Sequence, residues 1–400
     1  MSAQGRPKRE QVPERVSAEG RPPQGDRLAI AHTESSLGWG GQEIRTLTEA
    51  AGFIGRGHRV ILYAAPGSRI AAEAPRFGVP VTVLPIGRKR PAGVRSLVAN
   101  LRRHAVDIVN AHSSTDAWLA ALACAWLART RRAAPVLVRT RHVSIPVPRD
   151  FATRWLYQTA TARVVTTGAA LREQLIRDNG LDAARVASVP TGIDTAAFAP
   201  LSRAAARREL GLPDTAPLAG IVATLRSWKG HRYLVEATPL LRRRDARLVI
   251  VGDGPQRAAL EAQVARLDLS ERVLFAGERT DVARWLAALD VFVLPSYANE
   301  GVPQALLQAM LAGIPCVTTD AGAIPEIARD GDTARIVPRE NAAALAAAID
   351  SVFDDPAASA AIAERARAFV LPRFGIETML DRMEAVFCSA LAERETLGRR

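Results

Sequence analysis

The sequence predicts an α/β protein with two Rossmann-like domains, each built on a parallel sheet. Its 400 residues, of which 48% are hydrophobic, are enough to form two cores of ordinary size. Short apolar runs alternate with helical patterns along most of the chain, as in sheets that are covered by helices on both faces. We expect strands at 28–31, 60–63, 79–84, 108–111, 136–138 and 164–166 in the first domain, and at 218–223, 246–251, 273–275, 291–294 and 314–318 in the second.

Composition divides the chain into four parts. Residues 1–27 form a basic tail rich in Pro and Gly, which we expect to be disordered. The first domain spans 28–198 and ends in a turn-rich strip, and the second spans 199–372. Residues 373–400 carry a closing helical pattern.

The stretch 291–322 carries the strongest local signal in the sequence. An apolar strand ends in a turn-rich loop that places Glu300 directly before a helix, whose first position suits Pro303. Ligands of parallel sheets bind beyond the carboxyl ends of the strands, and helix N-termini attract phosphate. Glu300 and the backbone N–H groups of Gly301 and Val302 could therefore line a site for a phosphorylated ligand. The alternative is a surface glutamate in an ordinary loop.

Two glycine motifs follow other predicted strands. Gly40 and Gly41 lie between the first strand and a helix, where a glycine loop lets the backbone approach a ligand closely. Gly252 and Gly254 occupy the equivalent place after the strand at 246–251. Either motif taken alone is more often only a turn.

Lys229 follows the strand at 218–223 and comes just before a predicted helix. The chain has three lysines against fifty arginines, so a lysine here indicates that a compact ammonium suits the site better than a guanidinium. Arg226 lies in the same loop. The alternative, two basic side chains solvated at a helix start, would oppose the helix dipole.

These motifs resemble the donor-binding signature of the family-four retaining glycosyltransferases, whose GT-B fold has two Rossmann-like domains facing a cleft. In that family a Glu, seven residues and a second Glu are followed by Ala-Met-Ala-x-Gly-x-Pro and then by a Gly with Pro-Glu. Here Glu300 matches the first acid, and residues 309–315 contain Ala-Met-Leu-Ala-Gly-Ile-Pro. Gly322 and the pair Pro325-Glu326 complete the pattern.

The sequence departs from the family at two positions. Gln308 replaces the second acid, which usually holds the nucleotide ribose, and a glutamine still offers an acceptor and a donor. Thr224 stands where the family has an arginine, so we expect Arg226 to supply that charge. The resemblance thus predicts that Gln308 binds the ribose and that Arg226 and Lys229 neutralise the donor diphosphate.

The resemblance also implies roles for the remaining motifs. His142 matches a Thr-x-His that touches the donor sugar or the acceptor, and His112 is a second candidate. Arg279, in a loop where the family binds the base, could stack on that base. The expected catalytic residues are His142, Glu300, Lys229 and Arg226, and the expected donor-binding residues are Gly40, Gly41, Gly252, Gly254, Arg279, Gly301, Val302, Pro303 and Gln308.

The net charge of +12 is concentrated in the predicted first domain. Residues 28–198 carry 22 Lys and Arg against 11 Asp and Glu, whereas residues 199–400 carry 25 against 26. Clusters such as Arg88-Lys89-Arg90 attract anionic lipid, nucleic acid or a phosphorylated acceptor, although a solvated arginine-rich surface is the alternative. We expect an anionic glycolipid or polysaccharide acceptor and peripheral contact with an anionic membrane, and we do not expect nucleic acid.

Cysteine usage and hydropathy restrict the cellular setting. Cys124, Cys316 and Cys388 are far apart and have no paired spacing, which predicts reduced thiols and no metal site. The sequence has no apolar stretch that is long enough for a membrane span or typical of a signal peptide. We therefore expect a cytoplasmic protein at the cytoplasmic face of the inner membrane, without a cofactor other than its nucleotide-sugar substrate.

The sequence and its resemblance together predict a retaining glycosyltransferase. It would move a hexose-type sugar from a UDP- or GDP-sugar, bound by the second domain, to a lipopolysaccharide-like glycolipid or polysaccharide precursor bound by the first. The closing helix would pack back toward the first domain, as is usual in GT-B enzymes. Two alternatives remain open: a GT-B sugar-nucleotide epimerase, which needs no acceptor, and a non-catalytic GT-B protein that binds an anionic polymer.

Overall fold

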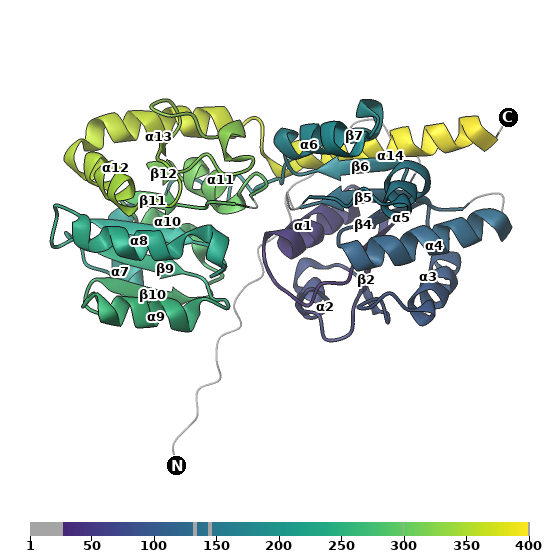
Figure 1. Ribbon diagram of the computed structural model, residues 1–400, viewed down its shortest axis with the longest axis horizontal. Helices are drawn as coiled ribbons and strands as arrows, with labels where there is room; N and C mark the ends of the chain where they lie inside the picture. The colour runs from purple at the N-terminus through teal and green to yellow at the C-terminus, as the bar shows by residue number, and fades with distance from the viewer. Residues whose placement is uncertain (1–26, 131–133, 143–145, 299, 399–400) are drawn as a thin grey trace, which may run out of the picture.

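The computed structural model describes residues 27–130, 134–142, 146–298 and 300–398, which form two α/β domains side by side (Figure 1). The tail predicted at 1–27 lies almost wholly outside the described residues. Among those that are described, no helix combines the length and the apolar character needed to cross a membrane.

The first domain contains a seven-stranded parallel sheet with strand order β3-β2-β1-β4-β5-β6-β7. The order reverses between β1 and β4, which creates the switch point where parallel sheets bind ligands. The strands are β1 (Ala29–Glu34), β2 (Arg59–Ala64), β3 (Val81–Val83), β4 (Ile108–Ala111), β5 (Val136–Arg141), β6 (Arg163–Thr166) and β7 (Val186–Ser188).

The second domain repeats this plan with six parallel strands in the order β10-β9-β8-β11-β12-β13. Its switch point lies between β8 and β11. The strands are β8 (Leu218–Val222), β9 (Arg247–Val251), β10 (Val273–Gly277), β11 (Val291–Leu294), β12 (Cys316–Thr318) and β13 (Arg335–Ile336).

Helices cover both sheets, because the central strands are buried on both faces and their apolar side chains need cover on each side. The first domain has α1 (Gly41–Gly55), α2 (Arg69–Glu73), α3 (Pro91–Arg103), α4 (Ser114–Thr130), α5 (Phe151–Trp155) and α6 (Ala169–Asn179). The second has α7 (Arg203–Leu210), α8 (His231–Ala237), α9 (Arg257–Arg266), α10 (Val282–Ala287), α11 (Gln304–Leu311), α12 (Ala342–Asp354) and α13 (Pro356–Val370), and α14 (Ile376–Gly398) closes the chain. Short turns of helix occur at Ala74–Phe77, Leu156–Ala160, Ala183–Arg185, Ser227–Lys229, Thr238–Leu240 and Ile324–Glu326.

The two-sheet α/β fold is confirmed, and each predicted strand is present with small shifts at its ends. The strip at 186–194 was expected to be a turn-rich connection, but its first three residues form β7 and pair in parallel with β6. β13, of two residues, was not predicted. Pro303 precedes α11 as its N-cap residue and is not the first helical residue. Strands this short carry too little apolar pattern, so only pairing with a neighbour defines them.

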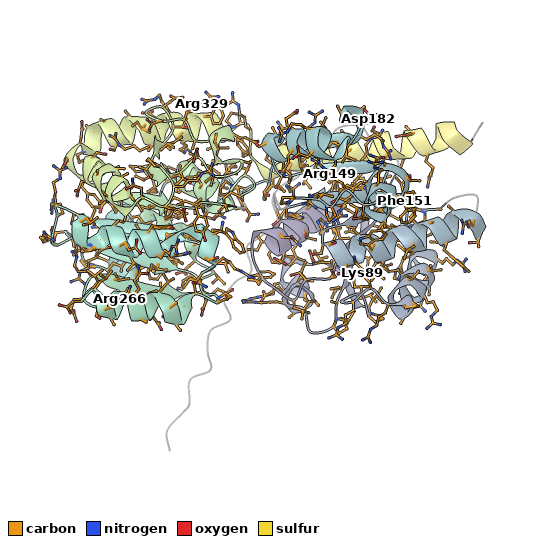
Figure 2. All side chains as sticks on the ribbon, viewed as in Figure 1. Lys89, Arg149, Phe151, Asp182, Arg266 and Arg329 are labelled. Carbon is orange, nitrogen blue, oxygen red and sulfur yellow. The ribbon has the colours of Figure 1, made fainter. Side chains whose placement is uncertain are left out.

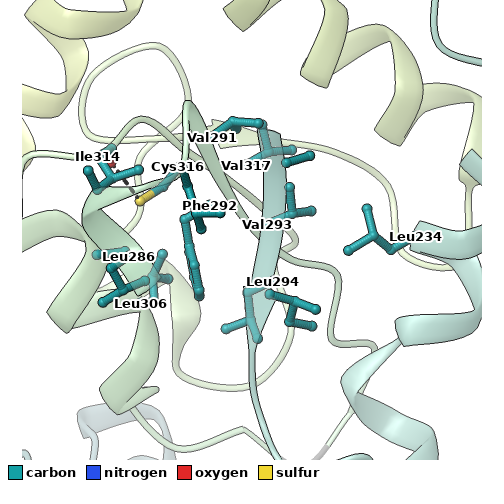
Figure 3. Close-up of a cluster of buried hydrophobic side chains, with 14 of the residues drawn as sticks. Leu234, Leu286, Val291, Phe292, Val293, Leu294, Leu306, Ile314, Cys316 and Val317 are labelled. Atoms are coloured by element: carbon teal, nitrogen blue, oxygen red, sulfur yellow. Dashed lines mark hydrogen bonds between the residues drawn. The ribbon is translucent and has the colours of Figure 1, made fainter. Parts of the chain in front are cut away.

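The core of the second domain surrounds β11 (Figure 3). Phe292 and Val293 point to opposite faces of the sheet and are both fully buried. On α11, Leu306 and Met310 are spaced by four residues, lie on one face of the helix and are both fully buried. This packing fixes where β11 ends and where α11 begins, and therefore where the loop containing Glu300 lies.

The last helix, α14, packs on the first domain and not on the second (Figure 1). Its buried side chains include Leu380 and Phe387, which lie in one core cluster with Phe53 of α1. A side chain at Gly52 would come within 2.4 Å of Leu380 Cδ1, so the helices approach closely because this residue is glycine. Arg56 adds ion pairs to three acids of α14, with the shortest distances at 2.6 Å.

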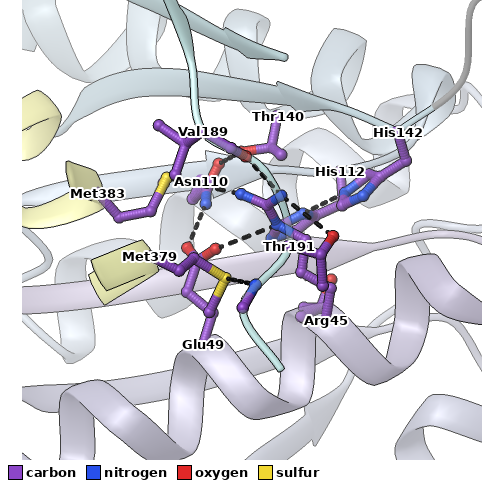
Figure 4. A network of polar contacts seen from close by, with 12 residues as sticks. Arg45, Glu49, Asn110, His112, Thr140, His142, Val189, Thr191, Met379 and Met383 are labelled. Atoms are coloured by element: carbon purple, nitrogen blue, oxygen red, sulfur yellow. Dashed lines mark hydrogen bonds and ion pairs between the residues drawn. The ribbon is translucent and has the colours of Figure 1, made fainter. Parts of the chain in front are cut away.

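A buried polar network joins α1 to the segment that leaves the first domain (Figure 4). Arg45, which is fully buried, donates from Nη1 to the carbonyl of Val189 at 2.7 Å and to Thr191 Oγ1 at 3.3 Å. Its Nε lies 3.7 Å from a carboxylate oxygen of Glu49, which also accepts a bond from Asn110. Burial raises the pKa of Glu49 to about 7, although Arg45 opposes this shift. The network thus supplies hydrogen-bond partners to polar groups of Val189 and Thr191, where the connecting segment runs through the interior of the domain.

Candidate active site

Several of the predicted site residues lie at the switch points of the two sheets. In the first domain, the glycine loop follows β1 and His112 follows β4. In the second, Lys229 follows β8 and Glu300 follows β11. Because neighbouring parallel strands end at the same edge of a sheet, segments far apart in sequence are brought together there.

Lys229 and Glu300 form an ion pair at the switch point of the second domain. Lys229 Nζ lies 2.7 Å from Glu300 Oε1 and 3.0 Å from Oε2. Ser296 Oγ also donates to Glu300 Oε1 at 2.6 Å. The carboxylate is 5% exposed and the lysine side chain is 21% exposed, so the ammonium has access to solvent and the acid is held almost entirely by protein. A cation that is fixed in this way can bind an anionic ligand without first being reoriented.

Two glycines allow the backbone to approach the loops that carry this pair. Gly322 has a φ of +56°, and a side chain there would come within 2.1 Å of the carbonyl oxygen of Glu300. Gly252 has a φ of +135°, and a side chain there would come within 2.1 Å of the carbonyl oxygen of Ala223, at the start of the loop that leads to Lys229. Both positions require glycine, because of the backbone conformation and the close approach. Gly254 contacts the same loop at Leu225.

The glycine loop of the first domain faces the second domain directly. Gln304 Nε2, at the start of α11, donates to the carbonyl oxygen of Gly41 at 3.0 Å. A side chain at Gly40 would lie 3.8 Å from Thr224 Oγ1. Next to Glu300, Gly301 packs against Thr167 of the first domain, where an added side chain would come within 2.5 Å of Thr167 Oγ1. Backbone from both domains therefore meets around the loop that contains Glu300.

Three histidines form a row across neighbouring strands of the first domain: His32 on β1, His112 after β4 and His142 after β5. Figure 4 shows His112 and His142. His32 Nδ1 lies 2.9 Å from His112 Nε2, and His112 Nδ1 lies 3.0 Å from His142 Nε2. Burial lowers the pKa of His142 well below its usual value, and the nearby Arg45 and Arg141 lower it further. His142 is therefore uncharged at neutral pH, and its imidazole can donate or accept a hydrogen bond. His112 contacts it directly, whereas His32 was not predicted from the sequence.

Two buried carboxyl groups lie where β1 ends and the glycine loop begins. Glu34, at the end of β1, accepts a hydrogen bond from Gln42 Nε2 at 2.6 Å, and its second oxygen accepts from Ser113 Oγ. Asp116 accepts from Thr33 Oγ1 at 2.7 Å. Burial, followed by the charge of Asp116, raises the pKa of Glu34 to about 8, so this carboxyl is largely protonated at neutral pH. Neither acid was predicted from the sequence, because neither belongs to a recognisable motif.

Other predicted site residues lie near this centre but have different partners. Arg226 is exposed, and its guanidinium lies 5.7 Å from the ring centre of Trp228. Arg279 lies over Trp285 at 5.1 Å and pairs with Asp281 at 3.3 Å, so its guanidinium already stacks on a protein ring. Val302 is buried, and Gln308 lies on α11 one turn beyond Gln304. The structure brings Lys229 and Glu300 into direct contact, whereas Arg226 and Arg279 lie over tryptophan rings.

Two acids of the second domain bind the first domain directly. Glu326, from the predicted Pro-Glu motif, accepts hydrogen bonds from the backbone N–H groups of Ala169 and Ala170, both at 2.8 Å. A carboxylate is favoured at this place because it faces the positive end of α6. Glu278 forms a bidentate pair with Arg69, at 2.6 and 2.7 Å, and Arg69 also lies over Trp39 of the glycine loop. The Arg69–Glu278 pair gives no local sequence pattern, because its members are 209 residues apart.

We expect Glu278→Ala to weaken the binding of UDP or GDP by about two- to five-fold, because an ion pair that is exposed to this degree contributes no more. The loss should be greatest at low salt, where the pair is least screened. Calorimetric titration with either nucleotide measures the change. The matched control is Arg76→Ala, which breaks an exposed ion pair within the first domain. Equal affinities for wild type and Glu278→Ala at low salt would contradict a role for this contact.

Comparisons with known proteins identify relatives for both domains. A family profile described as Glycosyltransferase Family 4 matches residues 39–197, and one described as Glycosyl transferases group 1 matches residues 216–355. The D-inositol 3-phosphate glycosyltransferase of Mycobacterium marinum is 31% identical over 317 residues, which cover 74% of this chain and 66% of that protein. The lipopolysaccharide core biosynthesis mannosyltransferase LpsB of Rhizobium meliloti is 32% identical over 50% of this chain and 60% of its own length. The chain spans between 48% and 66% of the curated relatives that it matches.

Solved structures share the complete two-domain arrangement. The Anabaena protein HepE, solved in complex with UDP, superposes with a TM-score of 0.79 at 23% identity and covers 90% of this chain and 100% of its own. A glycosyltransferase from Rickettsia africae has a TM-score of 0.81 at 21% identity, over 92% of this chain and 99% of its own. At these identities the structures establish the fold, and the family profiles establish the family. The chain is therefore a member of the family-four glycosyltransferases with the GT-B fold, as its motifs predicted.

Proposed function

We propose that this protein is a retaining glycosyltransferase that uses a nucleotide-diphosphate sugar. The observation that carries the proposal is the Lys229–Glu300 pair at the switch point of the second sheet, opposite the glycine loop of the first. Lys229 would bind the diphosphate, and Glu300 would accept hydrogen bonds from hydroxyls of the sugar. The UDP complex of HepE and the names of the relatives support a nucleotide-sugar donor.

In the proposed reaction the sugar moves from the diphosphate to the acceptor with retention of configuration. The bond between the anomeric carbon and the diphosphate oxygen breaks, and a bond from the acceptor hydroxyl oxygen to the same face of that carbon forms. The hydroxyl proton passes to the departing diphosphate, whose negative charge Lys229 stabilises, with Arg226 available in the same loop. His142, which is uncharged, would orient the sugar or the acceptor by a hydrogen bond.

The acceptor that we propose is an anionic glycolipid or polysaccharide precursor, met at the cytoplasmic face of the inner membrane. Relatives that are named for inositol phosphate and for lipopolysaccharide core support this class of acceptor. The charge of the first domain also favours an anionic partner.

Nuclear magnetic resonance of the protein with a panel of UDP- and GDP-sugars, with and without a lipid extract, tests the proposal. We expect a new glycoside with the anomeric configuration of the donor only when the extract is present, and slow hydrolysis of the donor to the nucleoside diphosphate without it. Conversion of the donor to an epimer without acceptor would identify an epimerase. No turnover of any donor would favour a non-catalytic binding protein.

We expect the replacement of Arg88, Lys89 and Arg90 together by Ser to weaken binding to anionic vesicles by about ten-fold or more at low salt. Each basic residue near such a bilayer contributes about 1 kcal/mol, and salt screens this attraction within about 10 Å. Vesicle co-sedimentation over a salt series measures the effect. The control replaces Arg243 and Arg244, exposed on the second domain, by Ser and should bind as wild type does. Equal binding of wild type to neutral and anionic vesicles, or tighter binding to nucleic acid, would overturn this interpretation.

A further inference from the structure

Helix α4 has an outward face that is apolar, although it is exposed. One side of α4 is buried in the core of the first domain, as expected from its Ala- and Leu-rich sequence. Leu122 and Trp126, one turn apart on the other side, are 45% and 59% exposed. Trp118, one turn earlier, is partly exposed on the same side. Surface helices normally present polar side chains to water, so an apolar outward stripe indicates a surface that something else covers.

The adjacent helix α5 extends this apolar surface. Trp155 stacks on Trp118 with ring centres 6.0 Å apart, so the two helices present one continuous aromatic surface. Phe151, the first residue of α5, is 86% exposed, the highest value among the large hydrophobic side chains described. Figure 2 shows Phe151 at the outer end of α5, on the side of the molecule from which α4 is also seen. We call Trp118, Leu122, Trp126, Phe151 and Trp155 the aromatic face.

Cations without acidic partners surround the aromatic face. Lys89 Nζ lies 5.1 Å from the ring centre of Trp118, and Arg102 donates to Thr130 at the far end of α4. Arg129 is exposed on the last turn of the same helix. Among the residues that the structure describes, none of these three cations makes an ion pair. By contrast, Arg242 and Arg243 of the second domain both pair with aspartates.

A cavity of about 360 Å³ beside α5 adds to this positive charge. Arg149 and Arg154 line it together with one acid, Asp178, which leaves one positive charge in excess. The cavity lies next to Phe151 in sequence and contains none of the residues of the Lys229–Glu300 site, so it is not the proposed donor site.

We propose that the aromatic face inserts into the interface of an anionic lipid bilayer, with the surrounding cations on the headgroups. Exposed Trp and Phe side chains next to Lys and Arg are typical of peripheral membrane surfaces, where apolar burial and charge attraction add together. The charge complementarity favours anionic lipid over a second copy of this chain, because two such surfaces would repel each other. This membrane surface rests on the proposed function, because that function requires an acceptor held at the membrane.

The position of α4 connects this surface to the site. Its first residue, Ser114, comes two residues after His112 at the carboxyl end of β4, and the aromatic face begins one turn later at Trp118. A protein docked through this face therefore holds the switch point of its first domain close to the bilayer, where an acceptor headgroup can reach it.

The test is co-sedimentation of the full chain with vesicles of phosphatidylcholine, alone and mixed with phosphatidylglycerol, at low and high salt. We expect wild type to bind the mixed vesicles and to keep part of that binding at high salt, because burial of apolar surface is not screened. Trp126→Ser combined with Phe151→Ser should lower the high-salt binding by about ten-fold or more. The melting temperature should not change, since both side chains are exposed. The matched control, Leu240→Ser with Leu274→Ser, removes two exposed side chains of the second domain and should bind as wild type does.

Two outcomes would overturn the inference. The first is high-salt binding of the double serine variant equal to that of wild type. The second is self-association of wild type in analytical ultracentrifugation that the variant loses, because the face would then join two copies of the chain. Turnover of the donor, measured in the same samples without vesicles, separates the two proposals. If the double serine variant loses vesicle binding but keeps donor turnover, the aromatic face serves membrane binding and not catalysis. A wild type without turnover would contradict the proposed function.

Discussion

Replacing Lys229 by Ala is expected to lower turnover of the donor by about 100-fold or more. The departing diphosphate loses its fixed cation, and one such group is typically worth about 3 kcal/mol of transition-state stabilisation. The structure adds a second reason, because Glu300 is almost fully buried and would lose the partner that lies 2.7 Å away. The loss should appear in kcat at saturating donor, since the charge on the diphosphate is greatest as the bond breaks.

Two matched variants separate the role of Lys229 from a general loss of charge. Lys89→Ala removes the other lysine in the described part of the chain, on the basic surface of the first domain, and should leave donor turnover without membranes unchanged. Lys229→Arg keeps the charge but replaces the compact ammonium by a larger, planar guanidinium, and we expect only partial activity. A Lys229→Ala variant with wild-type turnover at saturating donor would show that the diphosphate binds elsewhere.

Glu300→Gln is expected to lower turnover by about 10- to 100-fold, while the affinity for UDP or GDP changes little. The glutamine keeps a similar shape, and its amide oxygen can still accept bonds from Ser296 and from the Lys229 ammonium. It carries no charge, however, so its bonds to sugar hydroxyls are no longer charge-assisted and are weaker. UDP and GDP alone lack the sugar, so the Glu300→Gln change should leave their binding nearly unchanged. Initial rates together with calorimetry of the nucleotide measure both quantities.

A double-mutant cycle with Lys229→Ala tests whether these residues act as a unit. Residues in direct contact show coupled effects, so the double variant should lose much less activity than the product of the two single losses. Ser296→Ala serves as the control, because it removes only a supporting hydroxyl and should cost less than Glu300→Gln. A Glu300→Gln variant that loses nucleotide affinity as strongly as turnover would assign Glu300 to the nucleotide and not to the sugar.

Much of the fold follows from local pattern in the sequence. The apolar runs that become β8 and β11 are bounded by proline and polar residues, so their position could be predicted without any long-range information. The parallel arrangement then placed Lys229 and Glu300 after strand ends. The prediction failed for β7 and β13, because strands of three and two residues exist only through pairing with β6 and β12.

The sequence by itself determined the two-domain α/β fold, the loops that hold the site and the family. Only the tertiary structure decided which side chains meet. Lys229 and Glu300 are 71 residues apart, and Gln304 reaches Gly41 from a position 263 residues away. The aromatic face also depends on α4 and α5 packing so that Trp118 stacks on Trp155. Local patterns arise from interactions between near neighbours along the chain, whereas these contacts depend on strand order and helix packing, which no single segment encodes.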